Sequence, residues 1–287
     1  MVVVLDSKDL ALLDKEIAAE SQVWDILTQG AQAITAEDFV GAKEVRVNTM
    51  KGFTASDYKR NEDNGRAKLS IEKETVKLTQ ERWMAYDLDA LDQMESQALT
   101  IANATTEHAR LIATPDKDKY AMSQVVKNAG KLVKETITSA NALEAYDNAE
   151  QYMTDIECMS PMVMFASSDY YKALKNADGV SKTFTVNETS MNGINRKVAQ
   201  LDGGTPILNT SKGRIQVDPT KKINFVLLPL EAVAAIEKYN SVDLIPAAQD
   251  RDGYRDTVKN LDYYDAIILE NAKKVIYVSY EDVEVEG

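Results

Sequence analysis

The chain has 287 residues, of which 44% are hydrophobic and 28% are charged, and its formal net charge at pH 7 is −13. These proportions are ordinary for a soluble globular protein and exclude collagen-like, coiled-coil and disordered chains. A chain of this length can bury roughly three quarters of its extended surface, enough for one large core or two smaller ones. Because a net anion does not attract phosphates, a role in coating DNA is disfavoured.

The chain has one cysteine, Cys158, and one histidine, His108, which restricts the catalytic chemistry available to it. A single cysteine excludes an intrachain disulfide, and a single histidine disfavours His-rich zinc sites and Ser/His/Asp or Cys/His hydrolases. His108 falls on the apolar stripe of a predicted helix and is interpreted as a packed core residue, and Cys158 as a buried structural thiol. We expect no catalytic residue, no cofactor and no metal.

Three further motifs do not amount to a binding site. Strand-end solvation and helix capping explain the acidic cluster of Asp87, Asp89 and Asp92 better than a divalent metal does. Residues 250–253 begin like a calcium loop but lack its closing glutamate. The two glycines at 203–204 lack the lysine that follows in a phosphate-binding loop.

The hydropathy pattern predicts no contact with a membrane. The longest strongly apolar runs, such as residues 225–228, are far shorter than the roughly 20 residues that cross a bilayer. Residues 1–5 are followed by Asp6 and form a segment too short and too acidic for a signal peptide. We therefore expect the chain to stay where it is made.

Residues 6–28 are predicted to form an amphipathic helix that ends at Gly30. The apolar residues recur in it at steps of three and four, and they are Leu10, Leu13, Ile17, Trp24 and Leu27. Thr35 and Asp38 resemble a capping pair on a short turn. The first 40 residues contain eight acidic and two basic side chains, so this segment is strongly acidic.

A long hairpin is predicted over residues 43–82. Residues 43–49 alternate with period two, which is typical of a strand, and the alternation resumes after a polar stretch that contains the turn sequence Asp-Asn-Gly at 63–65. Residues 82–88 look like another strand. The hairpin holds ten basic and seven acidic side chains, so its charge is opposite in sign to that of the segment before it.

Helices are predicted next. Apolar residues over 91–112 step by three and four, with Asp89 as the N-cap and Pro115 as the residue that ends the helix. Residues 122–133 continue with a helical period. Asn141 begins a third helix, whose stripe reaches Ile156.

The carboxyl-terminal half mixes strands and helices, which makes the fold class α+β. A strand at 162–166 followed by a helix at 168–174 is expected, and the same order is expected for a strand at 223–228 and a helix at 230–238. Residues 198–208 look like a strand broken by a glycine turn. The remaining expectations are polar loops at 177–196 and 248–260, strands at 264–269 and 274–280, and an acidic tail at 281–287.

The helical arm and the hairpin are both marginal by themselves. An isolated two-stranded hairpin has little stability in water, and a terminal segment is poorly ordered unless another surface holds it. Each can gain stability on its own domain or on a second copy, and physical reasoning alone weighs these two options equally.

The order of several short motifs carries a family resemblance. After the helical arm come Phe-Val-Gly-Ala-Lys-Glu-Val-Arg-Val at 39–47, Gly-Phe at 52–53, Asp-Tyr-Lys-Arg at 57–60, Glu-Thr-Val-Lys-Leu-Thr-Gln-Glu-Arg at 74–82, Asp-Leu-Asp at 87–89, Thr-Pro-Asp-Lys-Asp-Lys-Tyr at 114–120, the glycine-broken strand at 198–208, and the closing strands Asp-Ala-Ile-Ile at 265–268 and Lys-Val-Ile-Tyr-Val at 274–278. Over nearly the whole chain this series resembles the major capsid proteins of tailed bacteriophages with the Hong Kong 97-type fold.

The resemblance implies a division of the chain into five parts. They are an N-arm at 1–41, an extended E-loop hairpin at 42–84, a P-domain with a long spine helix at 85–137, an A-domain of mixed sheet and helices at 138–261, and closing P-domain strands with an acidic tail at 262–287.

The resemblance also implies a function and its partners. The protein would be a non-enzymatic subunit that self-assembles through hexamers and pentamers into the icosahedral head around double-stranded phage DNA, without sequence-specific contact. A separate scaffolding protein and a portal protein would be further partners. Assembly would take place in the bacterial host cytoplasm, through a procapsid, and the product would be the virion capsid.

Intersubunit contacts are expected from the arm and the hairpin, and the residues assigned to them are Leu10, Leu13, Ile17, Trp24, Phe53, Tyr58, Lys59 and Arg60. Three alternatives stay open. They are an encapsulin-type nanocompartment shell of the same fold, a cytosolic α+β enzyme that uses carboxylates, and a tail-tube or other structural phage protein.

Overall fold

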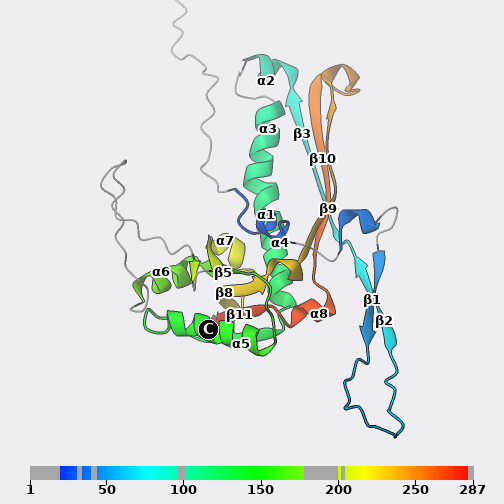
Figure 1. Ribbon diagram of the computed structural model, residues 1–287. Helices are drawn as coiled ribbons and strands as arrows, with labels where there is room; N and C mark the ends of the chain where they lie inside the picture. Colours follow the sequence, from blue (N-terminus) through cyan, green and yellow to red (C-terminus); the bar gives the residue numbers. More distant parts are fainter. Residues whose placement is uncertain are drawn as a thin grey trace, which may run out of the picture.

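The computed structural model describes residues 20–30, 34–39, 44–95, 101–177, 200–201 and 204–283. It has three parts, as Figure 1 shows. A column of helices stands beside a long three-stranded sheet, a six-stranded sheet carries further helices at the foot of that column, and a two-stranded hairpin projects away from both. This arrangement confirms the α+β class.

The hairpin consists of β1 (Glu44–Lys51) and β2 (Ser70–Lys77). The strands are antiparallel, with Glu44 opposite Lys77 at the base and Lys51 opposite Ser70 where the pairing ends. The residues between the strands form the loop at the tip. The predicted hairpin is therefore confirmed, whereas the strand expected at 82–88 belongs to another sheet.

The long sheet has the order β3-β10-β9, all antiparallel, from β3 (Gln80–Asp89), β10 (Arg255–Ile267) and β9 (Ala234–Ile245). Here the predicted helix at 230–238 is wrong, because only the 3-10 turn η3 (Leu230–Ala232) precedes the strand. Pairing with β10 along the length of β9 overrides the helical preference of its alanines. The polar loop expected at 248–260 is shorter, since η4 (Ala247–Gln249) and residues 250–254 link β9 to β10.

The helical column runs through α2 (Ala90–Glu95), α3 (Ile101–His108), the π-helical turn η2 (Ala109–Ala113) and α4 (Thr114–Lys127). The Asp89 cap is confirmed, because its Oδ1 accepts a hydrogen bond of 2.8 Å from the Leu91 N–H. Pro115 does not end the helix. It lies in the first turn of α4, where a missing N–H costs least, and the π-helical turn before it keeps the column continuous.

The helix predicted to continue through residue 133 stops at Lys127, because β4 (Lys131–Lys134) pairs in parallel with β11 (Tyr277–Asp282). Gly130 makes this turn possible. A Cβ at that position would lie 2.5 Å from the Lys273 carbonyl oxygen, closer than real contacts allow.

The six-stranded sheet has the order β4-β11-β8-β5-β7-β6. Its other strands are β5 (Met162–Ser167), β6 (Gln200–Leu201), β7 (Thr205–Thr210) and β8 (Lys221–Pro229). These strands confirm the expectations for 162–166, 198–208 and 223–228. The short helices α7 (Lys212–Ile215) and α8 (Glu270–Lys273) lie in the connections β7–β8 and β10–β11.

Each face of this sheet has its own core. Val163 and Phe165 of β5 point to the face covered by α4 and α1, whereas Met164 and Ala166 point to the opposite face. The opposite face is covered by α5 (Ala142–Asp155) and α6 (Ser168–Asn176), both predicted as helices. This alternation follows from the period of two in a strand.

The predicted amino-terminal helix is shorter where it is described. Residues 6–19 lie outside the described part of the chain, residues 20–23 are not helical, and α1 (Trp24–Leu27) has four residues. The turn at 35–38 is confirmed, because the Asp38 carboxylate accepts hydrogen bonds from the N–H and hydroxyl of Thr35 at 2.8 and 3.1 Å. That turn begins the 3-10 helix η1 (Ala36–Phe39). Most of the acidic tail forms the end of β11 or lies outside the described residues.

Candidate functional site

The hairpin tip carries large apolar side chains with no covering surface in the described chain. Phe53 is 71% exposed and Tyr58 is 78% exposed. Three more are over half exposed, namely Met50, Leu69 and Ile71. Met50 and Ile71 are directly opposite each other, so their side chains share one face of the ribbon. Clustered apolar surface of this kind typically marks a contact with another macromolecule.

The base of the hairpin is anchored in the body of the chain. Val76 is 6% exposed and packs in a cluster with Phe39 of η1 and Ile236 of β9. Val45 and Val47 of β1 pack against the same cluster. The Lys238 ammonium also donates a hydrogen bond to the Phe39 carbonyl oxygen. The ribbon is therefore held at one end only.

Gly52 sets the geometry at the point where the strands give way to the loop. Its φ of 99° lies in the left-handed region, and a Cβ there would be 2.5 Å from the Lys68 carbonyl oxygen. Only glycine adopts this conformation without strain.

The outermost turn is closed by one asparagine. Asn64 accepts a hydrogen bond from the Lys59 N–H at 2.9 Å and donates one to the Lys59 carbonyl at 3.1 Å. Lys59 and Arg60 are exposed in this turn. The Lys59 ammonium lies 3.7 Å from Glu62, but both groups are about two-thirds exposed, so this ion pair contributes little.

One face of the long sheet is also uncovered. Trp83 of β3 is 63% exposed, and it lies opposite Leu261 of β10, which is 42% exposed. The other face packs on the helical column, where Met84, Leu88 and Val258 form a small core with Ala104 of α3. The Trp83 face is thus a second apolar surface, separate from the hairpin tip.

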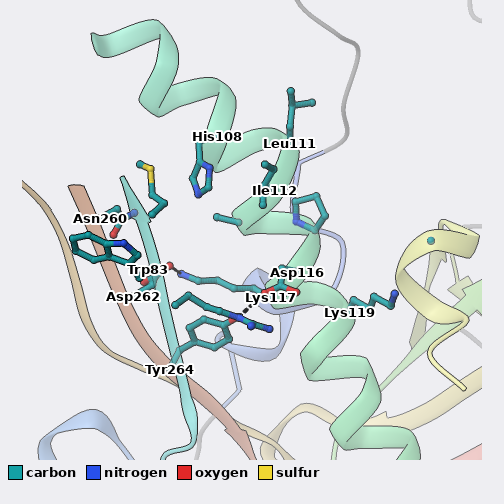
Figure 2. Close-up of a pocket in the computed structure, with 15 residues that line it drawn as sticks. Trp83, His108, Leu111, Ile112, Asp116, Lys117, Lys119, Asn260, Asp262 and Tyr264 are labelled. Atoms are coloured by element: carbon teal, nitrogen blue, oxygen red, sulfur yellow. Dashed lines mark hydrogen bonds and ion pairs between the residues drawn. The ribbon is translucent and has the colours of Figure 1, made fainter. Parts of the chain in front are cut away.

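Titratable side chains meet between the helical column and this sheet. Lys117 lies 2.9 Å from both Glu237 and Asp262, and Figure 2 shows its side chain reaching towards Asp262 below His108. His108 Nδ1 is 2.7 Å from the Tyr86 hydroxyl. These residues border a pocket of about 500 Å³, except for Tyr86 and Glu237, which lie beside it.

Burial and pairing together set the protonation of this group. Burial lowers the pKa of His108 and raises the pKa of Asp262, although Lys117 opposes the latter shift. Burial would lower the pKa of Lys117, but its hydrogen bonds to Asp262 and Glu237 raise it above the ordinary value. Lys117 is thus a cation paired with two carboxylates rather than a nucleophile or base. His108 is half-buried and hydrogen-bonded, which is close to the packed core residue that was predicted.

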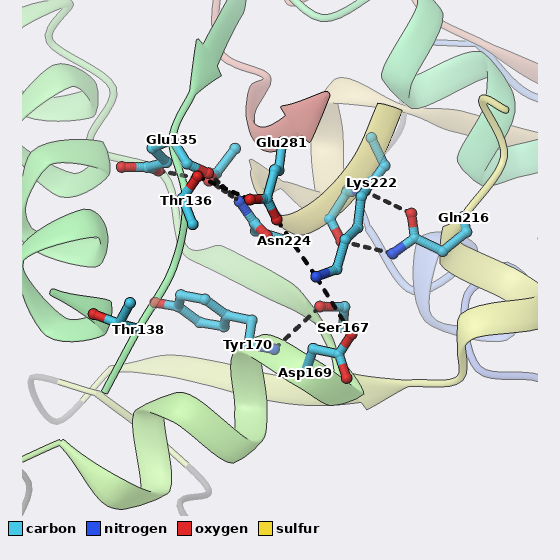
Figure 3. A network of polar contacts seen from close by, with 12 residues as sticks. Glu135, Thr136, Thr138, Ser167, Asp169, Tyr170, Gln216, Lys222, Asn224 and Glu281 are labelled. Atoms are coloured by element: carbon cyan, nitrogen blue, oxygen red, sulfur yellow. Dashed lines mark hydrogen bonds and ion pairs between the residues drawn. The ribbon is translucent and has the colours of Figure 1, made fainter. Parts of the chain in front are cut away.

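A second polar network ties the six-stranded sheet together (Figure 3). The Asn224 amide donates hydrogen bonds to the Glu135 carbonyl at 3.0 Å and to the Ser279 hydroxyl at 3.1 Å. Ser279 in turn donates to the Glu135 carboxylate at 2.5 Å. Nearby, Lys222 bridges Glu281 and Asp169 at 3.4 and 3.7 Å. Because these polar groups form their hydrogen bonds and ion pairs with one another, the network stabilises β4, β8 and β11 rather than presenting a reactive group.

The described ranges hold neither a metal-binding cluster nor a membrane-spanning helix. No group of three or more His, Cys, Asp or Glu side chains there could hold a metal ion. No helix in those ranges is long and apolar enough to cross a membrane. Cys158 is half-buried and packs at the edge of the core beneath α5, less enclosed than predicted.

Comparisons with known proteins test the fold that the sequence motifs predict. Neither a family model nor a curated protein matches the chain. Solved structures do: a structure of Mycobacterium phage Che8 is 18% identical, covers 95% of both chains and has a TM-score of 0.67. The capsid structure of cyanophage P-SCSP1u is 9% identical, with 96% of this chain and 93% of that chain covered and a TM-score of 0.71. The mature capsid of bacteriophage PhiM1 is 11% identical, with 93% and 89% covered and a TM-score of 0.69.

The chain has the Hong Kong 97-type capsid fold. The fold expected from the order of the sequence motifs is therefore confirmed.

Within this capsid fold, the residues assigned to intersubunit contacts fall into three groups. Phe53, Tyr58, Lys59 and Arg60 are exposed together in the hairpin loop. Leu10, Leu13 and Ile17 lie outside the described residues. Trp24 differs from the expectation, because its indole is 5% exposed and packs edge-on against Tyr264 of its own chain, with ring centroids 5.3 Å apart. We assign Trp24 to the core instead.

Sequence reasoning missed several exposed apolar residues of the capsid fold, namely Met50, Leu69, Ile71, Trp83 and Leu261. The strand alternation placed Leu69 and Ile71 on a face but did not show that no described residue covers it. Trp83 and Leu261 come together only because β3 pairs with β10, a strand that is distant from it in the sequence.

Proposed function

We propose that the protein is the major capsid protein of a tailed bacteriophage, a non-enzymatic subunit that assembles with copies of itself into the icosahedral head shell around double-stranded DNA. Its capsid fold supports this proposal, and the projecting hairpin is the single observation that carries it. The hairpin is held at its base and exposes five large apolar side chains at its far end. A ribbon of this kind is marginal unless it lies on another molecule.

We assign the five parts of the capsid subunit with changed bounds. The N-arm stays at 1–41, and the E-loop ends at residue 79, because residues 80–89 form β3 of the long sheet. The helical column is the spine helix of the P-domain. A boundary at residue 261 would cut through β10, which pairs with β3 on one side and with β9 on the other. We therefore place residues 234–267 with the P-domain, and the six-stranded sheet with α5 and α6 in the A-domain.

Assembly would work by many modest contacts. Each subunit touches several neighbours in a hexamer or pentamer, and closure of the shell makes the summed contacts difficult to reverse. A separate scaffolding protein and a portal protein would direct this step in the host cytoplasm, and the product is the virion capsid. The net charge of −13 is consistent with a shell that holds DNA without sequence-specific contact.

A pair of substitutions at the hairpin tip tests the proposal. Phe53→Ser with Tyr58→Ser removes two side chains that are exposed in the single subunit, so the free energy of unfolding should stay within about 0.5 kcal/mol of the wild-type value. Shell formation, measured by electron microscopy and sedimentation, should be lost, because truncating a buried aromatic anchor of an interface costs roughly 2 kcal/mol or more per contact.

The matched control is Met159→Ser. Met159 is 87% exposed but lies in the loop between α5 and β5, outside the hairpin. This variant should form shells like the wild type. Normal shells from the double hairpin variant would contradict the proposal that the hairpin tip makes an intersubunit contact.

A further inference from the structure

Asp118 is a fully buried carboxylate where three distant segments of the chain meet. It lies on α4, and its exposed fraction is 0%. Its Oδ1 accepts hydrogen bonds from the Ser21 hydroxyl at 2.8 Å and the Trp24 N–H at 2.8 Å, and a longer one from the Val23 N–H at 3.2 Å. One residue of the spine helix thus holds the last non-helical residues of the amino-terminal segment.

The second oxygen of the same carboxylate is also engaged. Oδ2 accepts a hydrogen bond from the Gln22 N–H at 2.8 Å and forms an ion pair with the Arg214 guanidinium of α7. A carboxylate offers about four lone-pair sites, so these donors use its full capacity. Arg214 compensates the buried negative charge, which would otherwise be costly.

The donors at 22–24 are the backbone groups that start α1. The residue before α1 is Val23, which has no polar side chain to cap the helix. The first N–H groups of a helix need acceptors, and a nearby carboxylate is a favourable one. The cap of α1 is therefore supplied by a residue more than 90 positions further along the chain.

Further contacts fix this segment on both sides. The Gln22 side-chain oxygen accepts a hydrogen bond of 2.8 Å from the Ser211 N–H, just before α7. On the far side of α1, a Cβ on Gly30 would lie 2.6 Å from the Leu230 carbonyl oxygen, so the backbone passes directly over η3. Residues 20–30 are thus bound to the spine helix, to α7 and to the start of β9.

We propose that Asp118 is a positioning residue for assembly: it fixes residues 21–24 on the spine helix, and with them the point at which residues 1–19 join the body of the subunit. This inference rests on the proposed function, because it takes those residues to be the arm that contacts a neighbouring copy. The arm then starts from a fixed point in the unassembled subunit. Without the Asp118 carboxylate, the arm stays covalently attached, but residues 21–24 are no longer held on the spine helix.

Asp118→Asn tests the inference, with Asp25→Asn as its matched control. Asn keeps the size of the side chain but replaces one acceptor oxygen by a donor that faces other donors. Asp25 lies on α1, is exposed, and its substitution removes the same charge without disturbing Asp118. In the unassembled protein, hydrogen exchange at the amides of residues 22–24 should be roughly tenfold faster or more in Asp118→Asn, and unchanged in Asp25→Asn.

Fluorescence gives a second readout on the same variants. The chain has two tryptophans, Trp24 at 5% and Trp83 at 63% exposure. In a Trp83→Phe background, Trp24 alone reports the segment, and Asp118→Asn should shift its emission to longer wavelength and increase its quenching by acrylamide. If Asp118→Asn unfolds the whole protein, Ser21→Ala, which removes one half-buried donor, should give the same changes to a smaller extent.

Shell formation separates this inference from the proposed function. We expect Asp118→Asn to give few or irregular shells under conditions in which the wild type and Asp25→Asn give regular ones. Regular shells from Asp118→Asn despite faster exchange at 22–24 would overturn the positioning role, and so would unchanged exchange. If the wild type itself forms no shells, the proposed function fails, whereas the exchange and fluorescence results still report on the contact at Asp118.

Discussion

Gly52 is the residue at which the two strands of the hairpin give way to its loop, and its conformation permits a direct test. Gly52→Ala should accelerate hydrogen exchange at the amides of β1 and β2, because alanine is strained at a φ of 99° and its Cβ meets the Lys68 carbonyl. The cost should be about 1 kcal/mol or more. The measurement is site-resolved exchange, because a hairpin held only at its base is expected to open without unfolding the rest of the chain.

Gly65→Ala is the control for this experiment, since a Cβ at Gly65 meets nothing within 4 Å and its φ is not in the left-handed region. Exchange in the hairpin should be unchanged or slower in that variant. Equal effects from the two substitutions would show that the conformation of Gly52 does not hold the loop.

His108 is the only histidine, which makes its effect on stability separable from that of other groups. Burial lowers its pKa below the ordinary value of 6.5, so the unfolded chain takes up the proton first as the pH falls. Its contribution to stability is therefore complete above pH 6.5 and is lost as the pH falls through 6.5 towards the lower folded-state value.

His108→Asn should remove this part of the acid sensitivity. Between pH 7.5 and pH 5.5, the midpoint of urea unfolding should fall further in the wild type than in the variant. Burial raises the pKa of Asp262, which has the opposite sign, but most of that shift is common to both proteins, because burial is its largest cause and His108 its smallest. An equal fall in both proteins would contradict the assignment of a buried, largely neutral His108.

We expect residues 1–19 and residues 20–30 to have different roles, and truncation should separate them. Deleting residues 1–19 should leave a folded subunit that no longer forms shells, because Val23, Trp24 and Leu27 remain in the core at 0, 5 and 0% exposure. Deleting residues 1–30 also removes these three side chains, and each large core truncation costs roughly 2–5 kcal/mol. That longer deletion should lower the melting temperature markedly.

Thermal unfolding together with sedimentation distinguishes the two truncations. Regular shells from the protein that lacks residues 1–19 would refute the role of the arm. Equal melting temperatures for the two truncations would show that α1 contributes no packing to the core.

Local pattern identified the elements whose periodicity is strong and whose partners lie close in sequence. The hairpin of β1 and β2, the helices α5 and α6, and the strands β5 and β8 all belong to this class. The exposure of Phe53 and Tyr58 was also predictable, since they lie in a polar stretch that cannot bury them.

Pairing between distant segments explains the elements that were predicted wrongly. The alanines at the start of β9 favour a helix locally, but the partner strand β10 makes an extended conformation more stable.

Two single residues were also misread for other reasons. A proline usually interrupts a helix, yet the π-helical turn at 109–113 accommodates Pro115. Trp24 lies on an apolar stripe in the sequence, but only the structure shows that Tyr264 of the same chain covers it.

For the molecule as a whole, we expect a stable body whose projecting hairpin is covered by other copies. The two cores of the six-stranded sheet and the helical column give the body its stability, whereas the hairpin tip and the Trp83 face leave apolar surface exposed. A single molecule in solution then exposes apolar surface that other copies would cover, so its association should depend steeply on concentration.

Electron microscopy of the purified full chain, alone and mixed with a candidate scaffolding protein, tests this claim most directly. We expect closed icosahedral shells of uniform size in at least one of these conditions. Dispersed single subunits in both conditions, or open tubes in place of shells, would contradict it.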